Sequence, residues 1–241
     1  MDGGLLMTGI VIAIDGPAGT GKSTVAREVA RRLRLAYFDT GATYRVGTLW
    51  CLKEGVDLAN ADDVANMVAT MNVELHLSPD NPRILLDDED VSQLIRSDTV
   101  ALTVSKVATN LEARSILGDW QRRVIALERD GGFSDGRGVV AEGRDITTII
   151  APEADVRVLM TADEEVRVAR RAGEGADAAT VREAVLGRDR QDATVVEFHT
   201  AADGVVTLDT THLTIEEAVQ AVLTLAREVQ DEIEGSGEAP A

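Results

Sequence analysis

The stretch Gly16-Pro-Ala-Gly-Thr-Gly-Lys-Ser23 matches the phosphate-binding pattern G-x-x-x-x-G-K-[ST]. Glycines let the backbone wrap closely around an anion and direct several N–H groups at phosphate oxygens. In loops of this pattern the lysine, here Lys22, reaches the β- and γ-phosphates, and the hydroxyl of Ser23 ligates Mg²⁺. We therefore expect this loop to bind a nucleoside triphosphate. The residues expected to hold it are Gly16, Pro17, Ala18, Gly19, Thr20, Gly21, Lys22, Ser23 and Thr24.

The segments that flank the loop support this interpretation. Residues 10–14 form an apolar run of strand length, rich in β-branched residues, that leads into the loop. Residues 22–35 follow with apolar side chains at helical spacing and basic side chains on the other face. A helix in this position would present its positive N-terminal end to the same phosphates.

Further along the chain, short apolar runs alternate with helical patterns. The runs that predict strands are residues 36–38, 138–141, 156–160 and 205–208. Alternation of this kind is typical of an α/β fold with a mainly parallel sheet covered on both faces. We expect one domain over residues 10–234, with disordered ends at residues 1–9 and 235–241.

Two segments interrupt the alternation. Residues 73–77 and 83–86 are strand-like and flank a strong turn signal, so they predict a small inserted hairpin. Residues 167–199 are charged and rich in arginine, and they predict two helices around a flexible joint, which would suit a lid. The last helix is expected to begin near Thr214, which has the capping-box spacing to Glu217, and to continue to about residue 233.

Composition excludes several classes of protein. A formal net charge of −18 argues against a broad nucleic-acid-binding surface. No stretch approaches the roughly 20 apolar residues that span a bilayer. Cys51 is the only cysteine, so no intramolecular disulfide can form, and we expect it to be a packed thiol in a helix. We expect a cytoplasmic monomer that binds neither nucleic acid nor membrane.

The phosphate-binding loop is shared by switch GTPases, mechanical ATPases and kinases. A GTPase would need an Asn-Lys-x-Asp segment, and none of the lysines, Lys22, Lys53 and Lys106, has that neighbourhood. A mechanical ATPase carries an apolar strand that ends in paired acids. The nearest candidate ends at Glu142 and continues into Arg144 and Asp145, which is more typical of substrate binding. A kinase of a small phosphate-bearing acceptor remains, and the many arginines suit its charge.

Several segments together resemble the bacterial cytidylate kinases, from about residue 10 to residue 229. They are Ala13-Ile-Asp-Gly-Pro-Ala-Gly-Thr-Gly-Lys-Ser23, Asp39-Thr-Gly-Ala-Thr-Tyr-Arg45, Glu89-Asp-Val-Ser92 with Ile95-Arg96, Ser105-Lys-Val-Ala108, Glu142-Gly-Arg-Asp145 and Leu208-Asp-Thr-Thr211. The resemblance implies a nucleoside-monophosphate-kinase fold with a parallel five-stranded core, an acceptor-binding insert at about 56–105 and a helical lid at about 163–199. It also implies transfer of the γ-phosphoryl group of MgATP to CMP or dCMP.

The resemblance also assigns roles to individual residues. Those implied to bind the acceptor are Thr40, Arg45, Ser105, Arg114, Arg144, Asp145, Arg188 and Asp192. The groups expected to stabilise the transferred phosphoryl group are Lys22, Arg144, Arg167, Arg170, Arg171 and Arg188. Cytosine offers an amino donor beside acceptors, so a carboxylate such as Asp145 and an arginine such as Arg114 suit its edge.

The lid region departs from the family pattern. Val195 stands where an arginine is usual, and His199 stands where proline is usual. Valine cannot donate a hydrogen bond, so one contact to a phosphate or sugar would be missing. Two alternatives stay open, and the lid departure favours only the first of them. One is a catalytically weak paralogue that only binds nucleotide, and the other is a kinase for another small acceptor such as UMP or AMP.

Overall fold

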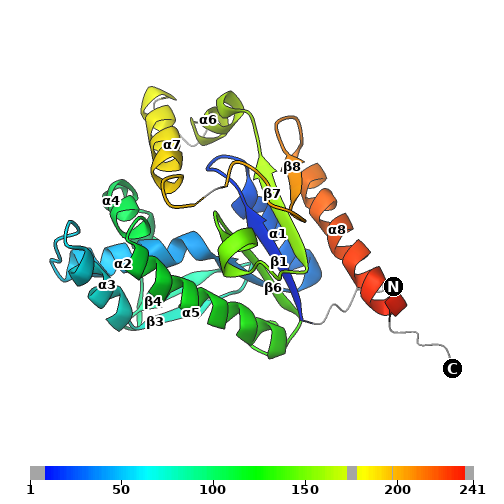
Figure 1. The fold of residues 1–241 in the computed structure, drawn as a ribbon, viewed down its shortest axis with the longest axis horizontal. Helices are drawn as coiled ribbons and strands as arrows, with labels where there is room; N and C mark the ends of the chain where they lie inside the picture. Colours follow the sequence, from blue (N-terminus) through cyan, green and yellow to red (C-terminus); the bar gives the residue numbers. More distant parts are fainter. Residues whose placement is uncertain (1–8, 173–177, 197, 237–241) are drawn as a thin grey trace.

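The computed structural model describes residues 9–172, 178–196 and 198–236, and Figure 1 shows its arrangement. A five-stranded sheet with the order β2-β6-β1-β7-β8 lies at the centre, and every neighbouring pair in it is parallel. Its strands are β1 Ile10–Asp15, β2 Ala36–Asp39, β6 Gly138–Gly143, β7 Val156–Thr161 and β8 Val206–Asp209. The predicted α/β fold and all five predicted core strands are confirmed.

Strands β1 and β6 are buried on both faces of the sheet. Their sequences are therefore nearly continuous apolar runs and do not alternate between apolar and polar residues. Their parallel register pairs Ile10 with Gly138 and Asp15 with Gly143. Residues 10, 12 and 14 of β1 face one apolar cluster, and residues 11 and 13 face another. This register brings the carboxyl ends of β1, β2 and β6 to one edge of the sheet.

Helices cover both faces. On one side α1 Lys22–Leu33 packs against α8 Ile215–Ser236, and both contribute to the first apolar cluster. On the other side lie α5 Leu111–Asp130 and the short η2 Ile146–Ile150. The predicted capping box is confirmed, since Thr214 N donates to Glu217 Oε2 at 2.8 Å and Glu217 N donates to Thr214 Oγ1 at 3.2 Å.

Both chain ends require a correction. Gly9 was expected in the disordered N-terminus, but Gly9 N donates a hydrogen bond to the carbonyl oxygen of Gly136 at 2.7 Å. Helix α8 continues to Ser236, so Gly235 and Ser236 are helical and do not belong to a disordered tail. Residues 1–8 and 237–241, the remainder of the expected disordered ends, lie outside the described residues.

Between β2 and α5 the chain forms a separate layer. It contains α2 Thr40–Lys53, α3 Ala61–Thr70, β3 Val73–His76, β4 Arg83–Leu86, β5 Glu89–Asp90, η1 Leu94–Arg96 and α4 Asp98–Ala108. The predicted hairpin is confirmed as β3 and β4, and β5 adds a third antiparallel strand. The two-residue β5 was missed because so short a strand leaves no alternating pattern in the sequence. Cys51 is buried within α2, as expected.

Two further helices stand over the carboxyl edge of the central sheet in Figure 1, namely α6 Glu164–Ala172 and α7 Ala178–Asp192. They confirm the two helices predicted for the arginine-rich segment. The joint that was expected between them, residues 173–177, lies outside the described residues. Within the described ranges, no helix has the length and apolar character that crossing a membrane requires.

Candidate active site

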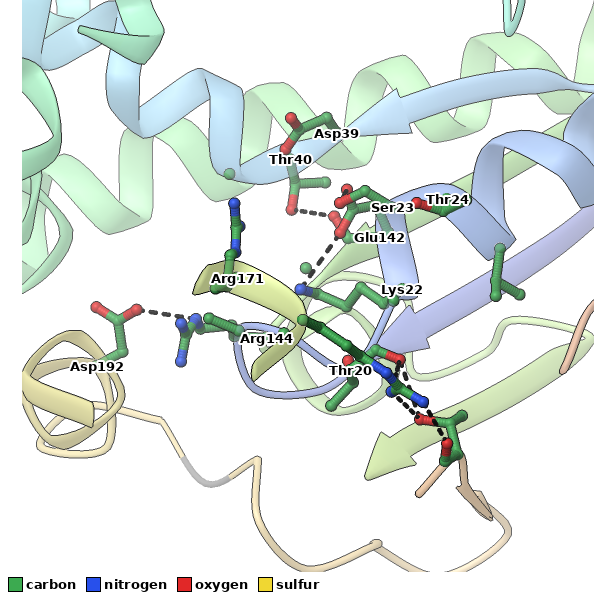
Figure 2. A pocket seen from close by; sticks show the side chains of 18 of the residues that line it. Thr20, Lys22, Ser23, Thr24, Asp39, Thr40, Glu142, Arg144, Arg171 and Asp192 are labelled. Carbon is green, nitrogen blue, oxygen red and sulfur yellow. Dashed lines mark hydrogen bonds and ion pairs between the residues drawn. The ribbon is translucent and has the colours of Figure 1, made fainter. Parts of the chain in front are cut away.

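A cavity of about 650 Å³ opens along the carboxyl edge of the sheet. Its walls come from the phosphate-binding loop, the starts of α2 and α8, the end of β6, and the helices α4, α5, α6 and α7. Figure 2 shows side chains from the loop, the start of α2, the end of β6, α6 and α7 around a common space. Several elements that are distant in sequence therefore form one site, in the position where open α/β sheets bind ligands.

Most of the phosphate-binding loop lines this cavity as predicted, from residue 18 to residue 24, whereas Gly16 and Pro17 lie in the loop outside the lining. Gly19 has φ +84°, and a Cβ there would come within 2.6 Å of the carbonyl oxygen of Arg167. Only glycine therefore allows helix α6 to approach the loop so closely. Gly21 caps the start of α1 in a left-handed conformation and leaves the helix N-terminus open toward the cavity.

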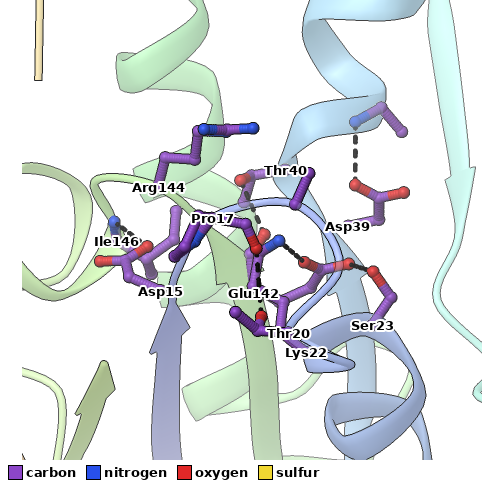
Figure 3. A network of polar contacts seen from close by, with 12 residues as sticks. Asp15, Pro17, Thr20, Lys22, Ser23, Asp39, Thr40, Glu142, Arg144 and Ile146 are labelled. Atoms are coloured by element: carbon purple, nitrogen blue, oxygen red, sulfur yellow. Dashed lines mark hydrogen bonds and ion pairs between the residues drawn. The ribbon is translucent and has the colours of Figure 1, made fainter. Parts of the chain in front are cut away.

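Glu142 joins the loop to the sheet, and Figure 3 shows this network. Its Oε1 accepts hydrogen bonds from Ser23 Oγ at 2.5 Å and from Tyr37 Oη at 3.0 Å. Its Oε2 lies 3.5 Å from Lys22 Nζ. Because the hydroxyl of Ser23 donates its hydrogen bond to Glu142, the lone pairs of its oxygen stay available for a cation. A carboxylate and a hydroxyl beside a phosphate cradle are hard oxygen ligands, which fit Mg²⁺.

From the sequence, Glu142 is expected in a substrate-binding segment, because Arg144 and Asp145 follow it. The structure instead places it in direct contact with two residues of the phosphate-binding loop. The pairing of β6 with β1 brings it there, since residue 142 lies opposite Ile14 just before the loop. An acid at the end of an apolar strand was the available signal, but strand order decides whether such an acid faces the loop.

Asp15 ends β1 and is buried beneath the segment that carries Arg144 and Asp145. Its carboxylate accepts hydrogen bonds from Ile146 N at 3.0 Å and from Thr147 N at 2.7 Å. Burial raises the pKa of Asp15 to about 6, although these hydrogen bonds act in the opposite direction. This contact fixes the start of η2 to the central strand, and it was not predicted from the sequence.

One end of the cavity is lined by arginines from the inserted layer. Arg45 from α2 lines it and has no hydrogen bond or ion pair with any residue that the structure describes. Arg96 from η1 also lines it and lies 3.2 Å from Asp39 Oδ2. The sequence analysis named Arg96 only as part of a motif. Thr40 is buried at the start of α2 and donates to the carbonyl oxygen of Glu142 at 2.9 Å.

Arg114 and Asp145 form an ion pair in the same region, although they are 31 residues apart. Arg114 also donates to the carbonyl oxygen of Ala108 at 3.0 Å and lies over the ring of Tyr44, 5.5 Å from its centroid. Burial raises the pKa of Asp145, while Arg114 acts against this rise. Both charged residues line the cavity. Ser105 in α4 is not among the lining residues, so its role stays a prediction.

Arg144 directly follows β6 and connects the sheet to helix α7. Its Nη1 lies 2.7 Å from Asp189 Oδ1, and its Nε lies 2.9 Å from Asp192 Oδ2. Asp192, which the resemblance assigned to the acceptor, therefore pairs with a second predicted acceptor ligand. Burial raises the pKa of Asp189, but Arg144 and Arg167 outweigh it and hold that pKa below its usual value.

The three arginines of α6 do not all face the cavity. Arg170 and Arg171 line the cavity, and Arg170 donates to the carbonyl oxygen of Thr210 at 2.7 Å. Arg167 is buried outside the lining, where it binds Asp189 at 2.5 Å and the carbonyl oxygen of Ala18 at 3.1 Å. It faces the phosphate-binding loop because α6 packs against that loop. The side chain of Arg188 lies outside the described residues, so its role stays a prediction.

Comparisons with known proteins agree with this geometry. The family model described as cytidylate kinase matches residues 12–228. A cytidylate kinase of Streptomyces griseus subsp. griseus is 40% identical over 90% of this chain and 92% of its own length. One of Cutibacterium acnes is 41% identical over 90% of this chain and 95% of its own. A solved gluconokinase of Sinorhizobium meliloti 1021 shares the fold, with a TM-score of 0.50 and 15% identity over 95% of this chain and 99% of that one.

Proposed function

Because the chain belongs to the cytidylate kinase family, we propose that it transfers the γ-phosphoryl group of MgATP to CMP or dCMP. The products are ADP and CDP or dCDP. One observation carries the proposal, namely that a single cavity joins the phosphate-binding loop to the cluster of Arg45, Arg114 and Asp145. A donor and an acceptor could therefore meet without leaving the protein.

ATP occupies the end of the cavity at α1. The loop amides and the N-terminus of α1 bind its phosphates, and Lys22 approaches the β- and γ-phosphates. Leu213, Ile215 and Ala218 supply apolar surface beside Thr24, which suits the face of a purine ring. Arg170, fixed by Thr210, closes this part of the cavity.

Ser23 would hold Mg²⁺ together with the phosphates, and the bound cation would supply positive charge that offsets the charge of the phosphates. Glu142 orients the hydroxyl of Ser23 by accepting a hydrogen bond from it. Tyr37 holds the same carboxylate oxygen from β2. These two contacts give the cation-binding oxygen one orientation before the nucleotide arrives.

CMP occupies the end of the cavity at α2 and α5. Arg45 and Arg144 bind its phosphate through charge-assisted hydrogen bonds, and Arg96 lies close enough to the same wall to take part. Asp145 accepts from the amino group of cytosine, and Arg114 donates to its acceptors. Uracil presents a carbonyl where cytosine has the amino group, so the carboxylate of Asp145 repels it.

Transfer needs little covalent work from the protein, because alignment and neutralisation of the moving group supply most of the acceleration. Lys22, Arg144 and Arg171 bring positive charge into the cavity between the two ends. The ion pairs of Arg144 with α7 keep that helix over the site and exclude water that would otherwise take the phosphoryl group.

The proposal includes the organisation inferred from the sequence. Residues 56–105 serve as the acceptor-binding insert and residues 163–199 as the lid of a kinase domain at 10–234. The enzyme acts as a monomer in the cytoplasm and binds no nucleic acid. The single cysteine and the net charge of −18 support the last two points.

A coupled assay of ADP release tests the proposal, with MgATP and CMP, dCMP, UMP, AMP, GMP, dTMP or no acceptor. Turnover with CMP and dCMP alone supports it. Turnover with another acceptor would show that the roles given to Arg114 and Asp145 are wrong. Protein that binds ATP but turns over none of the acceptors would contradict the proposal and make the nucleotide-binding paralogue the better interpretation.

A further inference from the structure

Phe198 lies against the guanidinium group of Arg144, with Cζ of the arginine 4.6 Å from the centroid of the ring. The phenylalanine is 1% exposed and the arginine side chain 14% exposed, so water is largely excluded between them. A cation on an aromatic face is attracted more strongly in such surroundings. The two residues come from different parts of the fold, because Arg144 follows β6 and Phe198 lies in the connection after α7.

The same guanidinium group is held along one edge by α7. Nη1 and Nε lie next to Asp189 and Asp192, at 2.7 and 2.9 Å. Arginine carries five N–H donors in a planar fork. No described residue accepts a hydrogen bond from Nη2 of Arg144, and the residue lines the cavity. The group is thus fixed on one edge and one face while donors remain for a phosphate.

We propose that Phe198 is a positioning residue for Arg144, whose guanidinium group it holds in the orientation that binds the phosphate of the acceptor. The inference rests on the proposed function, since it assigns a role in that reaction. An aromatic ring suits this role because it attracts a cation without carrying a charge of its own. A carboxylate in its place would compete with the phosphate for the donors of Arg144.

The lid of this chain makes the contact more important. Val195, three residues before Phe198, has no donor for a phosphate oxygen. Arg144 therefore supplies a larger part of the positive charge at this end of the cavity than it would if residue 195 were an arginine. Misplacement of such a group by about 1 Å can lower the rate of transfer by about 100-fold. A fixed orientation of Arg144 offsets the missing donor.

The test compares Phe198→Leu, which stays apolar but removes the aromatic face, with Phe198→Tyr, which keeps the face. We expect the leucine variant to lose about tenfold in kcat/KM for the acceptor, while Phe198→Tyr stays within about twofold of wild type. Calorimetric affinity for CMP in the absence of ATP should fall in parallel. Phe133→Leu makes the same substitution at a half-exposed position outside the cavity and should change neither quantity.

A double-mutant cycle separates positioning from mere packing. If Phe198 acts through Arg144, Phe198→Leu causes no further loss of kcat/KM in the Arg144→Gln background. Equal losses in both backgrounds would overturn the inference, as would a leucine variant that only unfolds at lower temperature. Should the leucine variant fail to fold, Phe198→Met replaces it. Wild-type turnover with CMP decides the proposed function separately, and with a different acceptor the same cycle is run on that acceptor.

Discussion

Ser23 Oγ donates a hydrogen bond to Glu142 Oε1 at 2.5 Å, although 119 residues separate them in the chain. The contact links the loop that binds the triphosphate to the strand that leads into Arg144 and Asp145. Donor and acceptor ends of the cavity therefore share one rigid connection through β6. A carboxylate is required here, because an amide in its place could also present N–H donors to Ser23 and Lys22.

We expect Glu142→Gln to lower kcat by about 10- to 100-fold and to raise the Mg²⁺ concentration needed for half-maximal rate. The reason is that the neutral amide can turn its N–H donors toward Ser23, so the hydroxyl no longer has one fixed acceptor. Initial rates measured over a series of Mg²⁺ concentrations check this. Glu128→Gln is the matched control, because Glu128 is equally buried but binds the amides of Phe133 and Ser134 far from the cavity. An Mg²⁺ requirement equal to that of wild type in Glu142→Gln would contradict the role.

Asp145→Asn tests how the base is read. The amide offers donors as well as an acceptor, so it should tolerate the carbonyl of uracil and reduce the preference for CMP over UMP by about tenfold. Competition kinetics with both acceptors present give this ratio directly. An unchanged ratio would remove Asp145 from base recognition and leave it as the partner of Arg114 alone.

Arg45→Ala tests whether Arg45 binds the phosphate of the acceptor. Arg45 has no partner among the described residues, so its loss leaves no buried charge unpaired. We expect kcat/KM for CMP to fall by about 10- to 100-fold, mainly through KM, while KM for ATP is unchanged. Arg123→Ala removes an exposed arginine on α5 outside the cavity and serves as the control. A rise in KM for ATP instead would show that Arg45 contacts the donor nucleotide, which contradicts its proposed place at the acceptor end of the cavity.

The raised pKa of the buried Asp15 carboxyl predicts that the stability of the protein depends on pH. Its pKa rises from the ordinary 3.8 to about 6 because it is buried, which corresponds to about 3 kcal/mol. The folded chain therefore binds this proton more tightly than the unfolded chain. The resulting stabilisation is complete below about pH 4 and is lost as the pH rises through about 6.

Urea unfolding of wild type and Asp15→Asn between about pH 4 and pH 7 checks this expectation. The asparagine cannot titrate, so the difference in free energy of unfolding between the two proteins should change over that range in favour of the variant as the pH rises. A difference that stays constant would show that Asp15 has an ordinary pKa.

Gly138 at the start of β6 tests the packing of the two central strands. Its φ is +117°, and a Cβ there would lie 1.8 Å from the carbonyl oxygen of Ile10. We expect Gly138→Ala to lower the free energy of unfolding by more than about 2 kcal/mol. Gly131→Ala is the control, because a Cβ at Gly131 meets no atom within 4 Å. Equal stability of the two variants would show that β1 and β6 can shift apart without cost.

Much of this architecture could be predicted from local patterns. Apolar runs located the five core strands, the turn signal located the hairpin, and the Thr214 to Glu217 spacing located the start of α8. What local patterns could not give was the end of α8 and the two-residue strand β5. A strand of two residues leaves no alternating pattern, and Gly235, a residue type that commonly marks a helix end, lies within α8.

The sequence by itself determined that this protein carries a phosphate-binding loop, because glycines, a lysine and a hydroxyl at fixed spacing form a phosphate cradle within one short segment. Only the tertiary structure decided which other side chains reach that cradle. Strand order placed Glu142 beside Lys22 and Ser23, helix packing turned Arg167 away from the cavity, and the chain after α7 laid Phe198 on Arg144. Contacts between distant segments depend on topology and register, which no local pattern of residues records.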